Sequence, residues 1–313
     1  MVLTVAVVGC AVLAAALTGS SVAALGGSVL RVLWVLPGLI GLHLSQLLVA
    51  ALGWRSLFVG QRPGVGVFYR LRVIREGIDS LLPVAQIGGE IVGARLLAKH
   101  RIAPGTAGAS VIVDVTVEFL TQVAFLFAGI AALAWLARRA PWDMALQVAL
   151  AAAAAAALLL ALRFGLLRVL DGLLRRIAQR WPALGGAAPG RLHDAALGFF
   201  RQRWAMRNCV LLHLVAWGLG TAETWAVLHA LGVPVSPVQA LVIESLGMAA
   251  RSAGFAIPAA LGVQEGGFML AVAAAGVPEA AAVPLVLLKR LREVSVGLIG
   301  LALWRFGARW QRA

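Results

Sequence analysis

Charged side chains are scarce in this chain of 313 residues, since only 13% of them are Asp, Glu, Lys or Arg. Ordinary soluble domains contain about 25%. Hydrophobic residues make up 61% of the chain, and its mean hydropathy is +0.93. A soluble globular protein of this composition would have too little polar surface to cover itself. The scarcity of charge therefore excludes that class and indicates a polytopic membrane protein.

Motifs of common enzyme and metal sites are also missing. The sequence has no P-loop, GxGxxG or GxSxG motif, which argues against nucleotide-driven work and serine-hydrolase chemistry. Cys10 and Cys209 lie in apolar runs apart from histidine clusters, and no two of the five histidines have metal-ligand spacing. We therefore expect no catalytic residues, no metal and no cofactor, and we expect packing or interfacial roles for the histidines.

Long apolar runs dominate what is present. A run of about 18 or more residues with almost no charge is long enough to cross roughly 30 Å of hydrocarbon. Six spans are predicted, at residues 2–25, 31–53, 107–136, 144–163, 208–231 and 282–304. The first run lacks a basic amino-terminal flank, so we expect it to be a retained helix and not a cleaved signal.

Two further segments are predicted to be broken helices. Residues 65–82 favour a helix that ends before Pro83, because proline removes an intrahelical hydrogen bond and disfavours helix at the residue before it. The half-helix that follows, residues 84–97, is too short and too rich in glycine to cross the membrane. Residues 236–275 repeat this pattern around Pro258. Each element is expected to be a re-entrant hairpin, which is tolerated where protein or a water-filled cavity satisfies its backbone. The alternative is that each makes two full crossings, which would change the number of spans by one or two.

A constant offset of 175 residues relates the two broken elements. It aligns Pro83 with Pro258 and Glu90 with Glu265 without a gap. Glycine lies close to both glutamates, which would let a ligand or another backbone approach, and each proline exposes helix-end groups able to bind an anionic headgroup. Small-residue helix packing is the alternative explanation of the glycines.

The same offset continues into the next apolar run, where it places Asp114 and Glu118 over Lys289 and Glu293. Each pair is spaced i, i+4 and so lies on one face of a helix. The sequence thus predicts two copies of a unit of about 60 residues. Because three spans separate the copies, they would be inverted, as in many transporters with discontinuous helices.

The predicted fold class is an all-α membrane protein with about six transmembrane helices and two re-entrant elements in an inverted repeat. The single domain, 1–313, would comprise two leading spans (1–64), repeat 1 (65–136), linking spans (137–235) with a basic cytoplasmic segment (163–207), and repeat 2 (236–313).

The distribution of basic residues predicts the orientation. With the amino terminus in the cytoplasm, 19 Lys and Arg residues fall on that side and three on the other. The 19 are Arg55, Arg62, Arg70, Arg72, Arg75, Lys99, Arg101, nine arginines between 163 and 207, Arg305, Arg309 and Arg312; the three are Arg31, Arg138 and Arg139. Both termini are therefore expected in the cytoplasm.

The basic segment 163–207 alternates arginine with Leu, Phe and Trp at roughly helical spacing. This pattern is typical of interfacial helices that bind anionic lipid, although plain positive-inside bias also explains it. The net charge of +14 could indicate nucleic acid. Anionic lipid headgroups are the nearer explanation in a protein with most of its mass in the bilayer, so we expect no nucleic-acid partner.

Ionisable residues inside the apolar segments are the candidate functional residues. Each costs about 2.5 to 3.5 kcal/mol at a helix centre, a cost that mutual pairing can offset. The acids are Glu90, Asp114, Glu118, Glu223, Glu244, Glu265 and Glu293; the bases are Arg95, Arg251, Lys289, Arg290 and Arg292. Arg95 and Arg251 are expected to face carboxylates across the interface between the repeats. The alternative is that the pairs only hold the helix bundle together.

Four stretches carry a resemblance to a known family: LLPVAQIGGEIVGARLL, ASVIVDVTVEFLTQ, IPAALGVQEGGFMLA and LLKRLRE. They resemble the flippase-like integral membrane family related to the transmembrane region of lysylphosphatidylglycerol synthases, and the first two are especially similar to its hopanoid-associated members. The resemblance implies a multi-pass protein of the bacterial inner membrane that moves or handles lipid. No aminoacyl-transferase domain follows residue 313, so we expect lipid translocation and not lipid aminoacylation.

The resemblance also points to particular residues. They are Pro83, Gly88, Gly89, Glu90, Arg95, Asp114, Glu118, Pro258, Gly262, Glu265, Gly266, Lys289, Arg290 and Glu293, to which the pattern of buried charge adds Arg251. The leading hypothesis is a translocase for hopanoid, a hopanoid-linked lipid or an anionic lipid, with hopanoid-pathway proteins among its expected partners. The alternatives are a membrane-embedded enzyme that modifies a lipid or polyprenoid, and a non-transporting scaffold for hopanoid enzymes.

Overall fold

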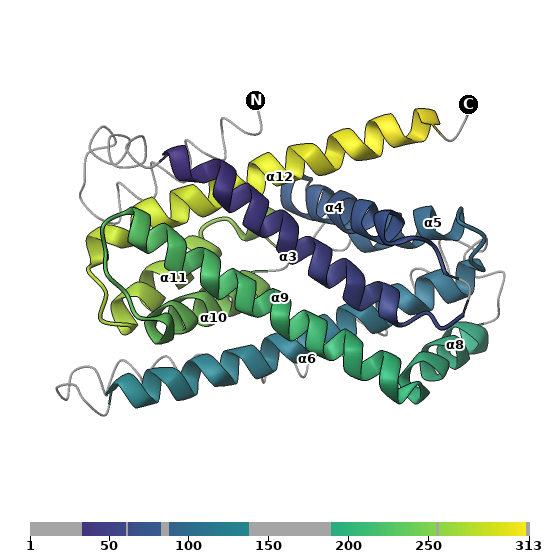
Figure 1. Cartoon of the computed structure of the whole chain (residues 1–313), viewed down its shortest axis with the longest axis horizontal. Helices are drawn as coiled ribbons and strands as arrows, with labels where there is room; N and C mark the ends of the chain where they lie inside the picture. Colours follow the sequence, from purple (N-terminus) through teal and green to yellow (C-terminus); the bar gives the residue numbers. More distant parts are fainter. Residues whose placement is uncertain (1–32, 61, 83–87, 138–188, 255–256, 311–313) are drawn as a thin grey trace.

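The computed structural model describes residues 33–60, 62–82, 88–137, 189–254 and 257–310. This part of the chain consists of helices and their connections, which confirms the all-α membrane class. The elements are η1 Leu33–Val35, α3 Leu36–Ser56, α4 Val65–Leu81, α5 Gly88–Ala98, α6 Pro104–Ala137, α8 Pro189–Arg201, α9 Arg203–Ala230, α10 Pro237–Ala253, η2 Pro258–Ala260, α11 Val263–Ala274, η3 Glu279–Ala281 and α12 Ala282–Trp310 (Figure 1).

Three of the described helices, α3, α6 and α9, are long and apolar enough to cross a membrane. They correspond to the spans predicted at 31–53, 107–136 and 208–231. Helix α12 has 29 residues and covers the span predicted at 282–304, but its first half carries several ionisable side chains. The spans predicted at 2–25 and 144–163 lie outside the described residues.

Both predicted broken helices have a helical piece on either side of the break. Helix α4 ends at Leu81, and Leu82 has the extended backbone expected of a residue before proline. Helix α5 then packs back against α4. In the second element, α10 begins with a capping box of Ser236 and Gln239. It is followed by η2 and by α11, which packs back against α10. Pro83 lies outside the described residues.

The start of α11 depends on a glycine. Gly262 has a φ of +82°, a conformation that glycine adopts without steric cost. Its backbone N–H donates a hydrogen bond of 2.7 Å to Oε2 of Glu265. A carboxylate in the first turn also interacts favourably with the positive end of the helix dipole. Local backbone geometry therefore holds Glu265 at the tip of the second hairpin.

Each hairpin packs against the long helix that follows the other hairpin. Helix α4 lies along α12, and α10 lies along α6, while α3 and α9 pack against each other. Figure 1 shows α3 antiparallel to α9 and α6 antiparallel to α12. Helices α6 and α12, which share a place in the two predicted repeats, therefore run in opposite directions, and each packs against the hairpin of the other repeat.

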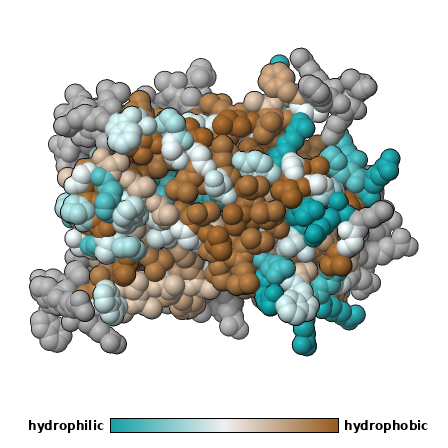
Figure 2. Space-filling view, viewed as in Figure 1, coloured by the Kyte–Doolittle hydropathy of each residue, from teal (hydrophilic) through white to brown (hydrophobic). Residues whose placement is uncertain are grey.

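The two hairpins open toward opposite ends of the molecule. The α3–α4 and α5–α6 connections lie at the right-hand end of Figure 1, and the α9–α10 and α11–α12 connections lie at the left-hand end. Hydrophobic residues cover the middle of the visible face, and hydrophilic ones gather mainly at the right-hand end (Figure 2). Helices α4 and α10 therefore run inward from opposite ends to the depth of the apolar belt.

The contact between α4 and α12 requires glycine. A Cβ atom on Gly77 would lie 2.6 Å from the carbonyl oxygen of Gly297, and one on Gly300 would overlap the carbonyl oxygen of Val73. Backbone atoms on both sides leave no flexible side chain that could move aside. The first hairpin and α12 can therefore approach each other this closely only with glycine at these positions.

Replacing Gly300 with alanine is expected to destabilise the folded protein by about 1 to 3 kcal/mol, the usual range for overpacking. The measurement is the temperature at which half of the monodisperse protein is lost on heating in detergent. Gly41→Ala is the matched control, because a Cβ atom there would have no neighbour within 4 Å. Equal midpoints for the Gly300→Ala protein and the control would contradict this account of the α4–α12 contact.

Candidate functional site

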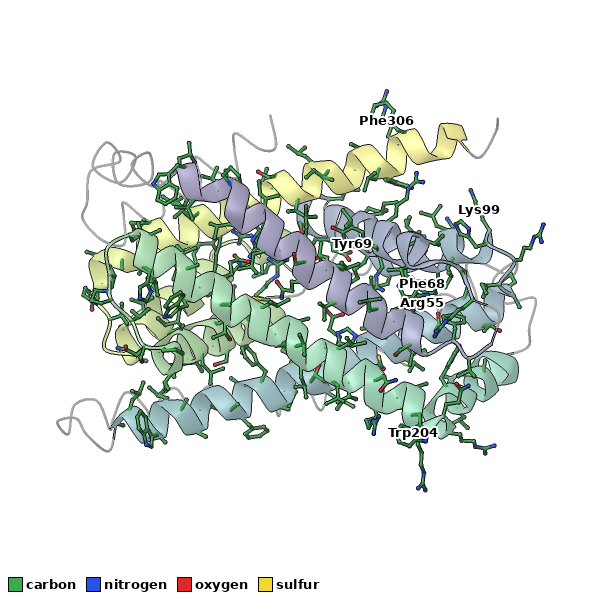
Figure 3. The ribbon with its side chains drawn as sticks, viewed as in Figure 1. Arg55, Phe68, Tyr69, Lys99, Trp204 and Phe306 are labelled. Atoms are coloured by element: carbon green, nitrogen blue, oxygen red, sulfur yellow. The ribbon has the colours of Figure 1, made fainter. Side chains whose placement is uncertain are left out.

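Buried ionisable side chains concentrate where the hairpins meet the long helices. The charged residues buried in the described part of the chain are Arg72, Arg75, Asp114, Glu223, Glu244, Glu265, Lys289, Arg290, Arg292 and Glu293, and His43 and His213 are buried with them. The sticks in Figure 3 show nitrogen and oxygen atoms between the ribbons along this interior. They form three clusters.

The first charge cluster is built around Asp114 on α6, whose side chain has no exposed surface. Its Oδ2 atom accepts hydrogen bonds of 3.0 Å from Nη1 of Arg72 and from Nη1 of Arg75, both on α4. Its Oδ1 atom lies 3.1 Å from Nε2 of His213 on α9. One carboxylate therefore joins the first hairpin to α6 and α9.

Two further carboxylates complete the first charge cluster. Arg72 also pairs with Glu118, one turn beyond Asp114 on α6, and Arg75 pairs with Glu90 near the start of α5. The side chain of Glu90 is 22% exposed, whereas that of Arg75 is 3% exposed. Arg75 thus links a fully buried carboxylate to one that is open to the surroundings.

Aromatic packing fixes the position of Arg75. Its guanidinium carbon lies 5.0 Å from the ring centroid of Trp54, within the range of a cation–π interaction. The Nε1 atom of Trp54 donates a hydrogen bond of 3.1 Å to Oγ of Ser110. The orientation of the arginine is therefore set by α3 and α6 as well as by its carboxylate partners.

The second charge cluster lies at the tip of the second hairpin. Nε of Arg290 is 2.6 Å from Oε1 of Glu265, and its Nη1 is 2.8 Å from Oε2 of Glu293. Arg251 on α10 lies 2.7 Å from Oε1 of Glu293, which also accepts a 2.8 Å bond from Gln264. Arg290 donates to the carbonyl oxygen of Ala259 in η2 at 2.9 Å. The bend of the hairpin is therefore attached to α12 by a charged side chain.

The third charge cluster joins α12 to α9, α10 and α3. Glu223 accepts hydrogen bonds of 2.8 and 3.1 Å from Arg292 and lies 3.6 Å from Nζ of Lys289. Lys289 is 2.8 Å from Oε2 of Glu244. Nη1 of Arg292 is 3.2 Å from Nε2 of His43, which itself lies 3.9 Å from Glu223. Each of these side chains has charged or polar neighbours, which lowers the cost of its burial.

Two basic residues are placed differently from the sequence expectation. Arg72 and Arg75 were expected on the cytoplasmic surface, but both are buried inside the molecule. Helix α4 is the reason, because it begins at Val65 and carries the two arginines two to three turns into the hairpin. Without these two arginines, 17 basic residues instead of 19 support the predicted orientation.

Polar residues on α4 are the functional candidates that the sequence reasoning missed. Arg72, Arg75, Glu76 and Asp79 follow the i, i+3, i+4, i+7 spacing of a single helix face. Glu76 lies 3.8 Å from His43, and Asp79 accepts a 2.8 Å hydrogen bond from the backbone N–H of Gly89. Their periodicity within residues 65–82 was the signal that could have identified them.

The predicted site residues of the two hairpins are only partly brought together. Gly89 is close-packed against α4, whereas a Cβ atom on Gly266 would meet nothing within 4 Å. Arg95 is exposed on α5, and Arg251 pairs with Glu293 of the same predicted repeat. The ion-pair partner of Arg251 is therefore on α12, although its charge also acts on Glu76 of α4, in the other predicted repeat. That Arg95 faces a carboxylate across the repeat interface stays a prediction. Gly88 begins α5, and Pro258 begins η2.

Cys209, which was expected to lie apart from histidine clusters, has one histidine beside it. Cys209 and His213 are one turn apart on α9, and with Asp114 they bring three potential metal-ligand atoms within 4.8 Å of one another. Two guanidinium groups already contact the carboxylate of Asp114. They would repel a divalent cation at short range, so the arrangement fits a buried ion-pair cluster better than a metal centre.

Comparison with known proteins identifies a family. The family model described as Lysylphosphatidylglycerol synthase TM region matches residues 1–300. No curated protein and no solved structure matches the chain. The match covers all the described helices except the last turns of α12.

Proposed function

We propose that this chain, which belongs to the Lysylphosphatidylglycerol synthase TM region family, moves a lipid from one leaflet of the membrane to the other. The family is one of membrane proteins related to lipid modification or transport. The finer proposal, translocation of an anionic, hopanoid or hopanoid-linked lipid, is supported by the pairing of broken helices with buried charge.

The single observation that carries the proposal is the pair of oppositely directed hairpins. The first helix of each runs inward to the depth of the apolar belt (Figures 1 and 2), and the second helix of each has a glutamate in its first turn. Discontinuous helices at this depth form the substrate sites of many transporters built from inverted repeats. Helices that served only to fill the bundle would need neither the breaks nor the charges.

A lipid headgroup would replace one carboxylate in an ion pair beside a hairpin break. Arg75 and Arg290 each hold two carboxylates, one beside a hairpin break and one on a long helix. A phosphate that approaches the partly exposed Glu90 could compete for Arg75 while Asp114 keeps the arginine in place. Glu90 and Glu265 would organise these cations or change protonation during alternating access, and Arg95, Arg251 and Lys289 are the further candidate headgroup contacts.

The proposed orientation places the right-hand end of Figure 3 in the cytoplasm. Arg55, Lys99 and Trp204 lie at this end. Helix α8 packs against α6 there and exposes Leu197 and Phe200. Basic and aromatic side chains together favour an interface with the anionic cytoplasmic leaflet. We also propose the bacterial inner membrane as the location and the boundaries 1–64, 65–136, 137–235 and 236–313 for the parts of the domain.

Reconstitution in liposomes tests the proposed function. We expect purified wild-type protein to move a fluorescent phospholipid between leaflets faster than protein-free liposomes do, measured by chemical quenching of the outer leaflet. Mass spectrometry of the same lipids should show no new species, because translocation changes sidedness and leaves mass unchanged. A lipid of altered mass would support the enzyme alternative, and no movement of anionic, neutral or hopanoid-like lipids would favour the scaffold alternative.

A further inference from the structure

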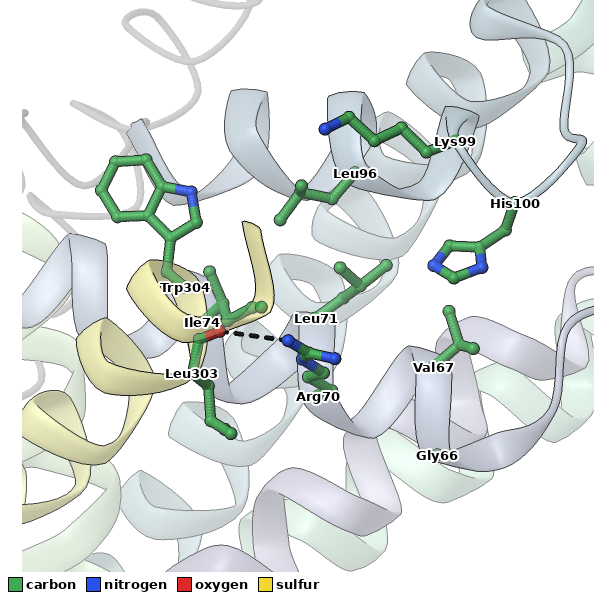
Figure 4. A pocket seen from close by; sticks show the side chains of 11 residues that line it. Gly66, Val67, Arg70, Leu71, Ile74, Leu96, Lys99, His100, Leu303 and Trp304 are labelled. Atoms are coloured by element: carbon green, nitrogen blue, oxygen red, sulfur yellow. Dashed lines mark hydrogen bonds between the residues drawn. The ribbon is translucent and has the colours of Figure 1, made fainter. Parts of the chain in front are cut away.

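A groove separate from the charge clusters lies between α4, α5 and α12. Its volume is about 290 Å³, and it is near the end of the molecule that carries Arg55 and Lys99 (Figures 3 and 4). Its lining includes residues from the first two turns of α4, the end of α5 and the last turns of α12. None of the three charge clusters contributes a residue to this lining.

One wall of the groove is basic. Arg70, Lys99 and His100 line it, and no residue of the described lining is acidic. Nη2 of Arg70 donates a 3.2 Å hydrogen bond to the carbonyl oxygen of Leu303, which holds the guanidinium against α12 (Figure 4). Burial and the charge of Arg70 both lower the pKa of His100. Arg70 and Lys99 create a positive potential that would attract an anion.

The remaining walls are apolar. Leu71, Ile74 and Leu96 line the groove together with the indole of Trp304. Figure 4 shows Leu96 beside Lys99, on the side toward the indole of Trp304. Tryptophan and lysine are the residues that anchor proteins at the level of lipid headgroups, because each has an apolar body and a polar tip. The groove therefore offers cations and hydrocarbon side by side.

We infer that this groove binds the phosphate headgroup of an anionic membrane phospholipid, with Arg70 and Lys99 as the phosphate contacts and Trp304 against the start of the acyl chains. The volume suits a glycerophosphate and the first methylene groups and is too small for whole acyl chains, which would continue into the bilayer. A free phosphate would satisfy the cations but leave the apolar walls uncovered. The site does not require that the protein translocates lipid.

Spin-labelled phosphatidylglycerol in nanodiscs that contain the protein tests this site. The fraction of motionally restricted label measures binding, and titration gives an apparent Kd. Arg70→Gln combined with Lys99→Gln should weaken binding by at least about tenfold, because charge-assisted hydrogen bonds to phosphate are lost. Arg62→Gln combined with Arg305→Gln is the matched control, since it removes two exposed charges that lie outside the groove and outside the basic segment 163–207.

Filling the groove provides a second, independent variant. Gly307 faces the guanidinium of Arg70, and a Cβ atom there would meet this flexible side chain and no backbone. Gly307→Leu should displace Arg70 and reduce binding by a similar factor. Unchanged binding in both groove variants, or an equal loss in the control, would overturn the inference. Competition by inorganic phosphate as effective as that by unlabelled phosphatidylglycerol would overturn the assignment to a lipid.

Discussion

Glu223→Leu is expected to destabilise the protein by roughly 3 to 5 kcal/mol, the usual cost of removing one partner of a buried ion pair. Glu223 is 1% exposed and is the only carboxylate that contacts Arg292 among the described hydrogen bonds and ion pairs. In the variant, the guanidinium would be left with the imidazole of His43 as its contact, and with the charges of Glu293 and Glu76, to which no described hydrogen bond or ion pair joins it. Lys289 would keep Glu244. The loss should be measured as the fraction of membrane-extracted protein that is folded and monodisperse.

Removing both charges should restore most of this stability. In a Glu223→Leu/Arg292→Met protein no buried charge loses its partner, and apolar replacement of a complete buried pair is often neutral or stabilising. Glu279→Leu serves as the control, because this acid is exposed in η3. A double variant as unstable as Glu223→Leu would show that the cost arises from packing and not from the uncompensated arginine.

Glu90→Gln combined with Glu265→Gln is expected to slow transbilayer lipid movement by at least about tenfold. Glutamine has nearly the shape of glutamate but makes neutral hydrogen bonds, which are roughly half as strong as charge-assisted ones. Arg75 would keep Asp114 at 3.0 Å, and Arg290 would keep Glu293 at 2.8 Å. The double variant should therefore fold, so that its effect is one on transport.

The liposome quenching assay described for the wild type measures this effect. Thermal stability in detergent must match the wild type within experimental error for the comparison to be valid. Glu279→Gln removes a charge from the surface and should leave the rate unchanged. A well-folded Glu90→Gln/Glu265→Gln protein that moved lipid at the wild-type rate would falsify the proposed site.

The predictability of the candidate site differed from residue to residue. Glu90 and Glu265 could be identified because they stand out against apolar surroundings and share an offset from a proline. Arg72 and Arg75 were not singled out, because the segment around them is rich in polar and basic residues and resembles a surface helix, although their spacing places them on one helix face. His213 was missed because its partner, Asp114, is 99 residues away in the sequence.

The sequence by itself determined the class of protein, the approximate bounds of the helices at 36–56, 104–137 and 203–230, and the positions of the two helix breaks. These properties follow from local composition and from proline, whose effects on the membrane and on the helix backbone are the same wherever a segment packs. The predicted and observed helix bounds agree approximately because local composition and proline set both.

Only the tertiary structure decided which charges meet. Each hairpin packs against the long helix that follows the other hairpin, so that α4 lies against α12 and α10 against α6. The packed helices bring Asp114 together with Arg72, Arg75 and His213. The energy of an ion pair depends on distance and on burial, and neither is encoded in the periodicity of one helix. The groove between α4, α5 and α12 arises in the same way, because its two cations and its tryptophan become neighbours only when these helices pack together.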